Sequence, residues 1–298
     1  MRGRWVGPAL ALASACSLLA PSDEELGGGG RASTAGGGGV GGTTTAEGGG
    51  GMAETCVRLD DATLEGAASL VFRSYLDVVY PTADGGEGVC EVVSGSLLRV
   101  APSDTFGLVD SPSGSGLSWK AAGAEGVVSE PLDGLRARLH GAVQITVELV
   151  VDVSAVAPSP PGLSQLVQLG AGDDLLAVAV AEPGQVLYAL GTGRAYWDQV
   201  DVTTEGRAVL HVTYDASATT PEERSQLYVD GETIPSVLSL DLQGAIALPS
   251  IAVVTIGGTA SIPSIEGQIS YIAIYDDLLL DNQIAANVAR LANDDDRP

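Results

Sequence analysis

The sequence predicts an all-β protein that folds as a sandwich of two antiparallel sheets. Residues 142–153 alternate for twelve positions between branched aliphatic side chains and other side chains, which is the pattern of a long, half-buried strand. Nine further strand-like segments are separated by glycine- and proline-rich turns, as in sandwiches and jelly rolls. Aromatic residues make up only 4% of the chain, so the core is expected to consist of small aliphatic side chains.

The N-terminus has the pattern of an export signal. Residues 1–15 contain two arginines, a short apolar run and small residues before Cys16, as in a secretory signal peptide. The small residues before Cys16 resemble the lipobox of bacterial lipoproteins, although Ala13 stands where leucine is usual. This resemblance implies a lipid anchor on Cys16 as the one membrane contact. Because Ser17 does not resemble an inner-membrane retention signal, we expect the outer membrane or cell surface. Cleavage without lipid and an uncleaved anchor are the alternatives.

Residues 16–51 are expected to form a flexible tether. Between Gly27 and Gly51, 14 of 25 residues are glycine. Such a segment buries too little apolar surface to offset the entropy lost on ordering. It should behave as a coil with a span of about 25–30 Å, enough to hold a domain away from a membrane surface.

The charge argues against two classes of partner. The chain has 38 acidic and 14 basic residues, with a formal net charge of −24. Nucleic acids require basic partners, and anionic lipid surfaces attract basic segments, so neither is expected to bind here. The acidic residues either keep the protein soluble or serve a cation or a basic partner.

The cysteines agree with export. Apart from Cys16, the chain contains only Cys56 and Cys90. In an oxidising compartment this pair is expected to form a disulfide, which would stabilise the domain by about 3–4 kcal/mol. Two independent buried thiols are the alternative, and the absence of a neighbouring histidine disfavours a metal site.

We expect residues 52–100 to form a lead-in segment that contains one helix. Between residues 61 and 79, apolar residues recur at helical spacing, with Asp61 as a candidate N-cap and Pro81 ending the run. The apolar positions are Leu64, Ala68, Val71, Tyr75 and Val78.

The sandwich itself is expected to span residues 101–293, followed by an acidic tail at 294–298. A terminal helix should begin with Asp281 as its cap and place Ile284, Val288 and Leu291 on one stripe. The expected strands are 117–121, 126–129, 142–153, 163–169, 175–181, 185–190, 207–215, 225–230, 251–257 and 266–275.

Four motifs in the C-terminal part carry a family resemblance. Residues 207–215 end in Thr-Tyr-Asp, and residues 225–231 contain Leu-Tyr-Val-Asp-Gly. Residues 256–258 are Ile-Gly-Gly, and residues 265–284 contain a Gly-x-Ile strand that ends in Ile-Tyr-Asp before a short helix. In order and spacing these motifs resemble the concanavalin A-like, laminin-G-like jelly-roll modules of bacterial surface proteins. The resemblance implies a jelly-roll sandwich with a short C-terminal helix.

No residue pattern indicates catalysis, so we expect a protein that is not an enzyme. His211 lies on a strand and His140 lies in a turn, and each is interpreted as a hydrogen-bonded packing residue. The chain lacks the serine-hydrolase elbow and a phosphate-binding glycine loop. It also lacks the Glu-x-Asp-x-x-Glu strand of glucanases that share this sandwich. A glycan-active hydrolase is therefore the weakest hypothesis.

Two features could serve binding. The first is an expected loop that contains Arg194, Tyr196, Trp197 and Asp198, in which the aromatic rings could stack on a sugar while the charged groups bind its hydroxyls. Burial of Trp197 in the core is the alternative.

The second feature consists of acidic residues in loops, namely Asp173, Asp174 and Asp215. Laminin-G-like modules often hold Ca²⁺ through such groups, and hard oxygen ligands suit that ion. Simple solvation of these carboxylates is the alternative.

These observations predict a non-catalytic, exported binding module that recognises a glycan or a surface protein in the cell envelope. The alternative is an architectural envelope lipoprotein that packs against other subunits and binds no small ligand.

The anchor gives a first testable prediction. Expressed in a bacterium with lipoprotein processing, the full chain should incorporate labelled palmitate, and Cys16→Ser should abolish the label because the acylated thiol is gone. Ser14→Ala is the control and should keep the label. Palmitate incorporation that persists in Cys16→Ser would overturn the anchor.

Overall fold

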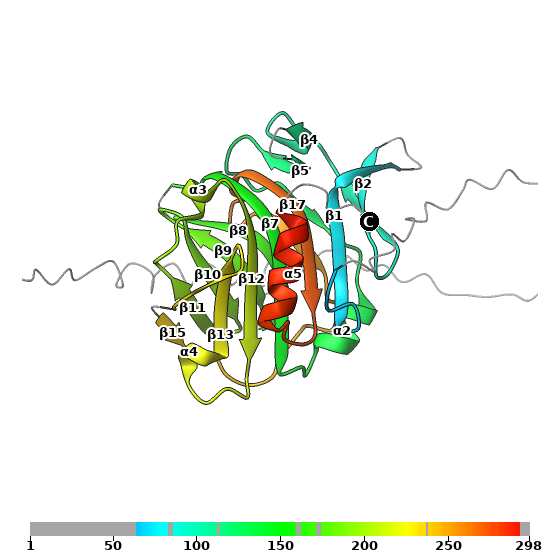
Figure 1. Ribbon diagram of the computed structural model, residues 1–298. Helices are drawn as coiled ribbons and strands as arrows, with labels where there is room; N and C mark the ends of the chain where they lie inside the picture. Colours follow the sequence, from blue (N-terminus) through cyan, green and yellow to red (C-terminus); the bar gives the residue numbers. More distant parts are fainter. Residues whose placement is uncertain are drawn as a thin grey trace, which may run out of the picture.

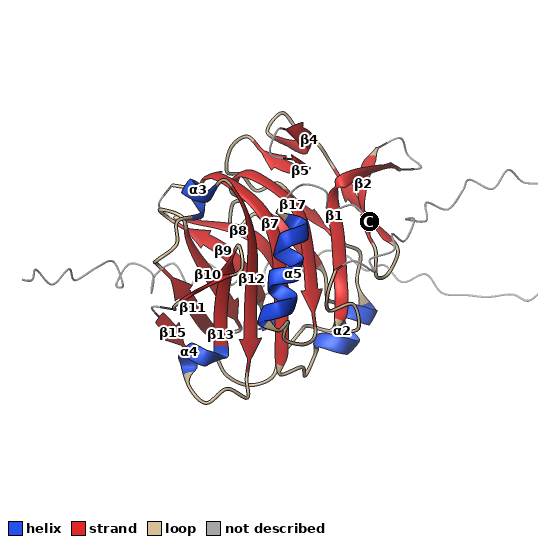
Figure 2. Cartoon of the chain, viewed as in Figure 1, coloured by secondary structure: helices blue, strands red, loops and turns tan. Residues whose placement is uncertain are grey.

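The computed structural model describes residues 64–292 except for 83–85, 112–113, 159–161, 171–173 and 237. Two antiparallel sheets pack face to face, and α5 (Asp281–Leu291) lies across the outer face of one of them (Figure 1). Strands dominate the described chain, and the helices lie at its periphery (Figure 2). The predicted all-β sandwich with a C-terminal helix is therefore confirmed.

The larger sheet has its strands in the order β14-β13-β12-β7-β17-β1-β2-β3, and the β4–β5 hairpin joins β17. Its strands are β1 (Leu70–Pro81), β2 (Glu87–Glu91), β3 (Ser96–Val100), β4 (Phe106–Ser111), β5 (Gly114–Trp119), β7 (Gln144–Ala155), β12 (Arg207–Asp215), β13 (Ser225–Val229), β14 (Glu232–Ile234) and β17 (Glu266–Tyr275).

The smaller sheet has the order β15-β11-β10-β9-β8-β16-β6. Its strands are β6 (Gly126–Val128), β8 (Leu163–Leu169), β9 (Leu176–Ala181), β10 (Gln185–Leu190), β11 (Gly193–Trp197), β15 (Leu238–Leu240) and β16 (Val254–Gly257). The shorter helices are α2 (Asp133–Leu139), α3 (Val202–Glu205) and α4 (Pro221–Arg224). Within the described residues, no helix is long and apolar enough to cross a membrane.

The main core lies between the two sheets. The alternating aliphatic side chains of β7 from Ile145 to Val153 are almost completely buried there, as the sequence predicts. Trp119, Trp197 and Tyr188 are the largest apolar side chains that fill the same space. Aliphatic and aromatic burial of this extent is the main favourable contribution to folding.

The outer face of β7 is buried as well, so the expectation of a half-buried strand is wrong. Thr146, Glu148 and Val150 have no exposed surface. A second cluster of apolar residues, which includes Ile284 and Leu291 of α5, covers this face. The helix therefore adds a partial third layer to the sandwich.

The expected helix within residues 61–79 is also wrong, because most of this segment forms β1. This strand lies between β17 and β2 and is covered on both faces, so its apolar residues do not alternate simply. Phe72 and Leu76 face the main core, whereas Tyr75 belongs to the outer cluster. A shift of register between Leu70 and Phe72 disturbs the period further. The larger sheet consequently starts at Leu70 rather than at residue 101.

The C-terminal helix begins as predicted, with one difference at its cap. Leu280 is the N-cap residue, and Asp281 is the first helical residue. The Tyr228 hydroxyl donates a 3.0 Å hydrogen bond to the Asp281 carboxylate. Burial, followed by this carboxylate, raises the pKa of Tyr228 to about 12, so the hydroxyl remains a donor.

Of the expected disulfide, only one half lies in the described part of the chain. Cys90 on β2 is buried and disulfide-bonded. Cys56 lies outside the described residues, as do the signal segment, Cys16 and the tether. The pairing of Cys56 with Cys90 therefore stays a prediction.

A buried polar network ties α5 to the larger sheet. Glu148 on β7 accepts hydrogen bonds from His211 Nε2 at 2.8 Å, from Asn287 Nδ2 at 2.8 Å and from the Tyr275 hydroxyl at 3.1 Å. The same tyrosine oxygen accepts a 3.0 Å hydrogen bond from Arg73 on β1. These five side chains, all fully buried, join four strands and the helix.

The network keeps Glu148 ionised. Burial favours the neutral carboxyl group, but the hydrogen bond and charge of His211, with the Asn287 amide, outweigh it and lower the pKa of Glu148. Burial and the neighbouring Glu148 carboxylate raise the pKa of Tyr275, so that its hydroxyl stays a donor.

We therefore expect Glu148→Gln to lower the free energy of unfolding at pH 7 by about 3–5 kcal/mol, because it removes one partner of a buried pair. The lowered pKa of Glu148 in the folded state stabilises the fold at pH values above the ordinary glutamate pKa. This stabilisation is lost as the pH falls from there through the lower pKa of the folded state. Urea unfolding between pH 3 and 7 should show a steeper acid decline in the wild type than in Glu148→Gln. Glu205→Gln on exposed α3 is the control. Equal curves for Glu148→Gln and the wild type would contradict this role.

Candidate functional site

A hollow of about 480 Å³ opens beside β10, β11 and β15, which lie together at one edge of the sandwich (Figure 1). We call it the end hollow. Its volume falls within the roughly 300–1,000 Å³ that is usual for small-molecule sites. It is lined by Leu190, Gly191, Thr192, Asp241, Gln243, Ala245 and Ala247.

One wall of the end hollow is the turn between β10 and β11. The main-chain nitrogen of Gly191 donates a 2.7 Å hydrogen bond to the carbonyl of Leu175. Arg194 Nη1 donates to the carbonyls of Gly191 and Gly193 at 2.5 and 2.6 Å. The guanidinium group therefore fixes the turn that presents Thr192.

The other wall is the segment 241–248, in which three buried side chains are separated by exposed residues. Its buried members, Leu242, Ile246 and Leu248, belong to the main core. The residues between them that line the end hollow are exposed. The segment therefore holds itself in place with one set of side chains and faces solvent with the other.

Hydrogen bonds fix the backbone of this second wall. Arg224 Nη1 donates to the Leu242 carbonyl at 3.0 Å, and the Tyr214 hydroxyl donates to the Gly244 carbonyl at 2.7 Å. A pair of main-chain hydrogen bonds also joins Ile246 to the turn after α2. The wall is thus anchored at several points along its length.

The two walls meet at Gly193. A Cβ atom on this residue would lie 2.7 Å from the main-chain oxygen of Asp241 and 2.9 Å from Leu242 Cα. Real Cβ atoms do not approach backbone this closely, so glycine is required for the contact. Asp241 itself has a φ of 50°, in the left-handed region that few residues other than glycine, asparagine and aspartate adopt readily.

The polar side chains of the end hollow are free to bind a ligand. Within the described residues, no hydrogen bond engages the Thr192 hydroxyl, the Asp241 carboxylate or the Gln243 amide, and all three side chains are exposed. Together they offer donors and acceptors beside the small apolar surfaces of the alanines. The described part of the lining contains no histidine, cysteine or serine and only one carboxylate. This chemistry suits the binding of hydroxyl groups.

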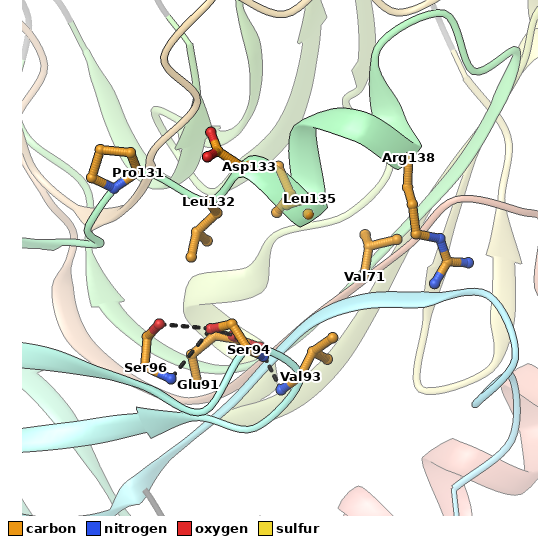
Figure 3. A pocket seen from close by; sticks show the side chains of 11 residues that line it. Val71, Glu91, Val93, Ser94, Ser96, Pro131, Leu132, Asp133, Leu135 and Arg138 are labelled. Atoms are coloured by element: carbon orange, nitrogen blue, oxygen red, sulfur yellow. Dashed lines mark hydrogen bonds between the residues drawn. The ribbon is translucent and has the colours of Figure 1, made fainter. Parts of the chain in front are cut away.

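A second hollow, of about 260 Å³, lies between α2 and the turn that joins β2 to β3 (Figure 3). Two of its three charged residues in the described chain, Glu91 and Arg138, are used by the protein itself. Glu91 accepts hydrogen bonds from the main-chain nitrogens of Arg73, Val93 and Ser94, at 3.2, 2.8 and 2.7 Å, and from the Ser94 hydroxyl.

Arg138, at the far side of the second hollow, is committed in the same way. It holds Asp276 through two hydrogen bonds of 2.6 and 2.7 Å and also donates to the carbonyls of Ala68 and Leu70. Because Glu91 and Arg138 are hydrogen-bonded within the protein and the volume is smaller, the second hollow is the weaker candidate for a ligand site.

The expected aromatic loop is not a loop, because Arg194 to Trp197 form strand β11. Trp197 is completely buried in the main core, so the core alternative is the one observed. Tyr196 is 9% exposed and packs in an apolar cluster on the outer face of the smaller sheet. Of the expected four, Asp198 is exposed and Arg194 supports the end hollow from behind. The structure does not bring them together as a sugar platform.

The expected calcium ligands are only partly visible. Asp173 lies outside the described residues, so a site that includes it stays a prediction. Asp215 accepts hydrogen bonds from the main-chain nitrogen and hydroxyl of Ser217, at 2.8 and 2.6 Å. Burial raises the pKa of Asp215, but these bonds outweigh it and lower the pKa. In the part of the chain that the structure describes, no group of three or more His, Cys, Asp or Glu side chains could hold a metal.

Both histidines are hydrogen-bonded, as expected, but only His211 is buried and His140 is exposed. His211 is buried against Glu148, and His140 Nδ1 accepts a 3.1 Å hydrogen bond from the main-chain nitrogen of Leu248. The second contact helps to hold the segment 241–248.

Sequence reasoning missed the three polar residues of the end hollow. The turn at residues 191–193 is recognisable from its glycines and lies directly before the residues proposed for binding. Asp241 and Gln243 carry no such mark, because nothing local shows that their segment packs against Gly193, some fifty residues earlier.

Comparisons with known proteins show the fold alone. No protein family matches the sequence, and no curated protein matches it. Domain 4 of AbnA, an extracellular arabinanase from Geobacillus stearothermophilus solved with arabinotriose, is similar with a TM-score of 0.50. At 14% identity the likeness covers 74% of this chain and 98% of that domain.

Two other solved structures resemble the chain more weakly. A Trypanosoma rangeli sialidase in complex with sialic acid has a TM-score of 0.49 and 15% identity over 75% of this chain. The match covers 33% of the sialidase, so this chain spans about a third of that protein. The binding domain of Paraclostridial Mosquitocidal Protein 1 has a TM-score of 0.47 and 11% identity, covering 74% of this chain and 52% of that one.

The contact at Gly193 gives a prediction for the site. Gly193→Ala should push residues 241–242 away and lower the free energy of unfolding by about 1–3 kcal/mol, because the clash is with backbone atoms. Gly134→Ala in α2 is the control, since its Cβ would meet nothing within 4 Å. Chemical denaturation measures both variants, and equal stabilities would show that the two walls are not in tight contact.

Proposed function

We propose that this protein is a non-catalytic carbohydrate-binding module whose ligand enters the end hollow. The observation that carries the proposal is the set of three unused polar side chains, Thr192, Asp241 and Gln243, between two anchored walls. A sugar is recognised by converging donors and acceptors with small apolar surfaces between them, and the end hollow offers both.

Rigidity of the walls supports the same interpretation. Binding to a mobile loop costs the free energy of ordering that loop, whereas a fixed site avoids this cost. In the end hollow the backbone is fixed by Arg194 on one side and by Arg224 and Tyr214 on the other. The three polar side chains are therefore the main groups left to order when a ligand binds.

The fold comparison points in the same direction. Domain 4 of AbnA, which was solved in complex with arabinotriose, is similar to this chain along almost its whole length. The residues that the structure describes in the end hollow contribute one carboxylate, Asp241, whereas glycoside hydrolysis usually requires two carboxylates on opposite sides of the scissile bond. These two observations favour binding over cleavage.

The proposed setting is the cell envelope. A signal segment, a lipid on Cys16 and a glycine-rich tether would hold the module outside the cytoplasm, within reach of surface or environmental glycans. A disulfide between Cys56 and Cys90 would suit the same compartment.

A glycan array with the purified chain tests the proposal. At least one class of oligosaccharide should bind, and the triple variant Thr192→Ala, Asp241→Ala and Gln243→Ala should lose the signal because the polar lining is gone. The matched control is Ser94→Ala, Ser96→Ala and Asp133→Ala in the second hollow, which should bind normally. Binding that survives in the first variant and is lost in the control would move the site to the second hollow.

A further inference from the structure

We infer that the end hollow discriminates by charge and selects sugars that carry no acidic group, rejecting sialic acids and uronic acids. This inference rests on the proposed function and specifies its ligand class. It follows from how the charges around the hollow are used.

Among the described residues that line the hollow, Asp241 is the one charged side chain. Its carboxylate is exposed and, within the described residues, forms no ion pair or hydrogen bond. An acidic sugar in the hollow would therefore face a like charge without a compensating cation. The formal net charge of −24 adds repulsion at longer range.

The two arginines that hold the walls of the hollow do not supply that cation. Arg194 directs Nη1 into the carbonyls of Gly191 and Gly193, and its Nε is buried without a partner in the described structure. Arg224 directs Nε and Nη1 into the carbonyls of Ala218 and Leu242. Both guanidinium groups build the walls from behind instead of lining them. A site for sialic or uronic acids would need a guanidinium aimed at the ligand carboxylate.

The same carboxylate favours hydroxyl-rich or amine-bearing sugars. Its two oxygens can accept from neighbouring hydroxyl groups, and a charged acceptor forms stronger hydrogen bonds than a neutral one. Thr192 and Gln243 provide donors and further acceptors for the rest of the ring. Attraction to the correct ligand and repulsion of the wrong one therefore come from one residue, Asp241.

The backbone offers a clean way to remove this charge. Asparagine tolerates the left-handed conformation that Asp241 adopts, so Asp241→Asn changes the charge and keeps the backbone. Asp230 has the same φ of 50° at the turn after β13 and does not line the hollow. Its carboxylate accepts from the main-chain nitrogen of Val209, which an asparagine oxygen can replace. Asp230→Asn is thus the matched control.

Titration calorimetry with the full chain tests the inference on pairs of oligosaccharides, one neutral and one acidic. The first pair is lactose and sialyllactose, and the second pair is galactotriose and trigalacturonate. Arabinotriose serves as a further neutral probe. In the wild type, at least one neutral probe should bind tenfold or more tightly than its acidic counterpart. Asp241→Asn should narrow that ratio about tenfold, which corresponds to the loss of one charge interaction of roughly 1.4 kcal/mol. Asp230→Asn should leave it unchanged.

The outcomes separate this inference from the function on which it rests. Acidic probes that bind the wild type as well as neutral ones, or a ratio that Asp241→Asn does not change, would overturn charge selection and leave glycan binding intact. Failure of all probes and of the glycan array would overturn the proposed function itself.

Discussion

The structure depends on the burial of β7 on both of its faces. One face packs against the smaller sheet, and the other is covered by α5, so the strand is interior to a protein of two sheets and a partial third layer. This burial forces Glu148, which points away from the main core, to be paired and hydrogen-bonded. Asn287 and His211 meet that requirement. Because Asn287 lies on α5, its hydrogen bond to Glu148 also holds the helix against the sheet.

The same constraint explains which elements the sequence predicts. Strands β8, β10, β12 and β17 match their expected ranges, because each is bounded by turn residues and carries a run of β-forming side chains. The apolar residues of strand β1 do not alternate as in a half-buried strand, because both of its faces are buried and its register shifts between Leu70 and Phe72. Their spacing therefore resembles that of a helix. Helix α2 was missed because it is short and its N-cap, Leu132, makes no side-chain capping bond.

The candidate site is predictable only in part, for a similar physical reason. Its first wall, a turn rich in glycine, leaves a local mark in the sequence. Its second wall depends on the close approach of Asp241 to Gly193, a contact between distant segments that no local pattern specifies. The local sequence around Trp197 is ambiguous, because an aromatic residue beside charged ones occurs both in binding loops and in strands that pack into the core.

Three arginines share one role in the described domain. Arg136, Arg194 and Arg224 each bind main-chain carbonyl groups of loops, where a forked, permanently charged donor can hold two acceptors. The composition, with a single lysine among 14 basic residues, is consistent with this structural use of arginine.

The alternation within residues 241–248 separates two demands that often conflict. Leu242, Ile246 and Leu248 secure the segment, whereas the side chains of Asp241, Gln243, Ala245 and Ala247 line the end hollow and are exposed. Related proteins could therefore exchange the outward-facing residues and acquire new preferences while the scaffold beneath remained untouched. Such a segment would let specificity drift quickly over evolutionary time at little risk to folding.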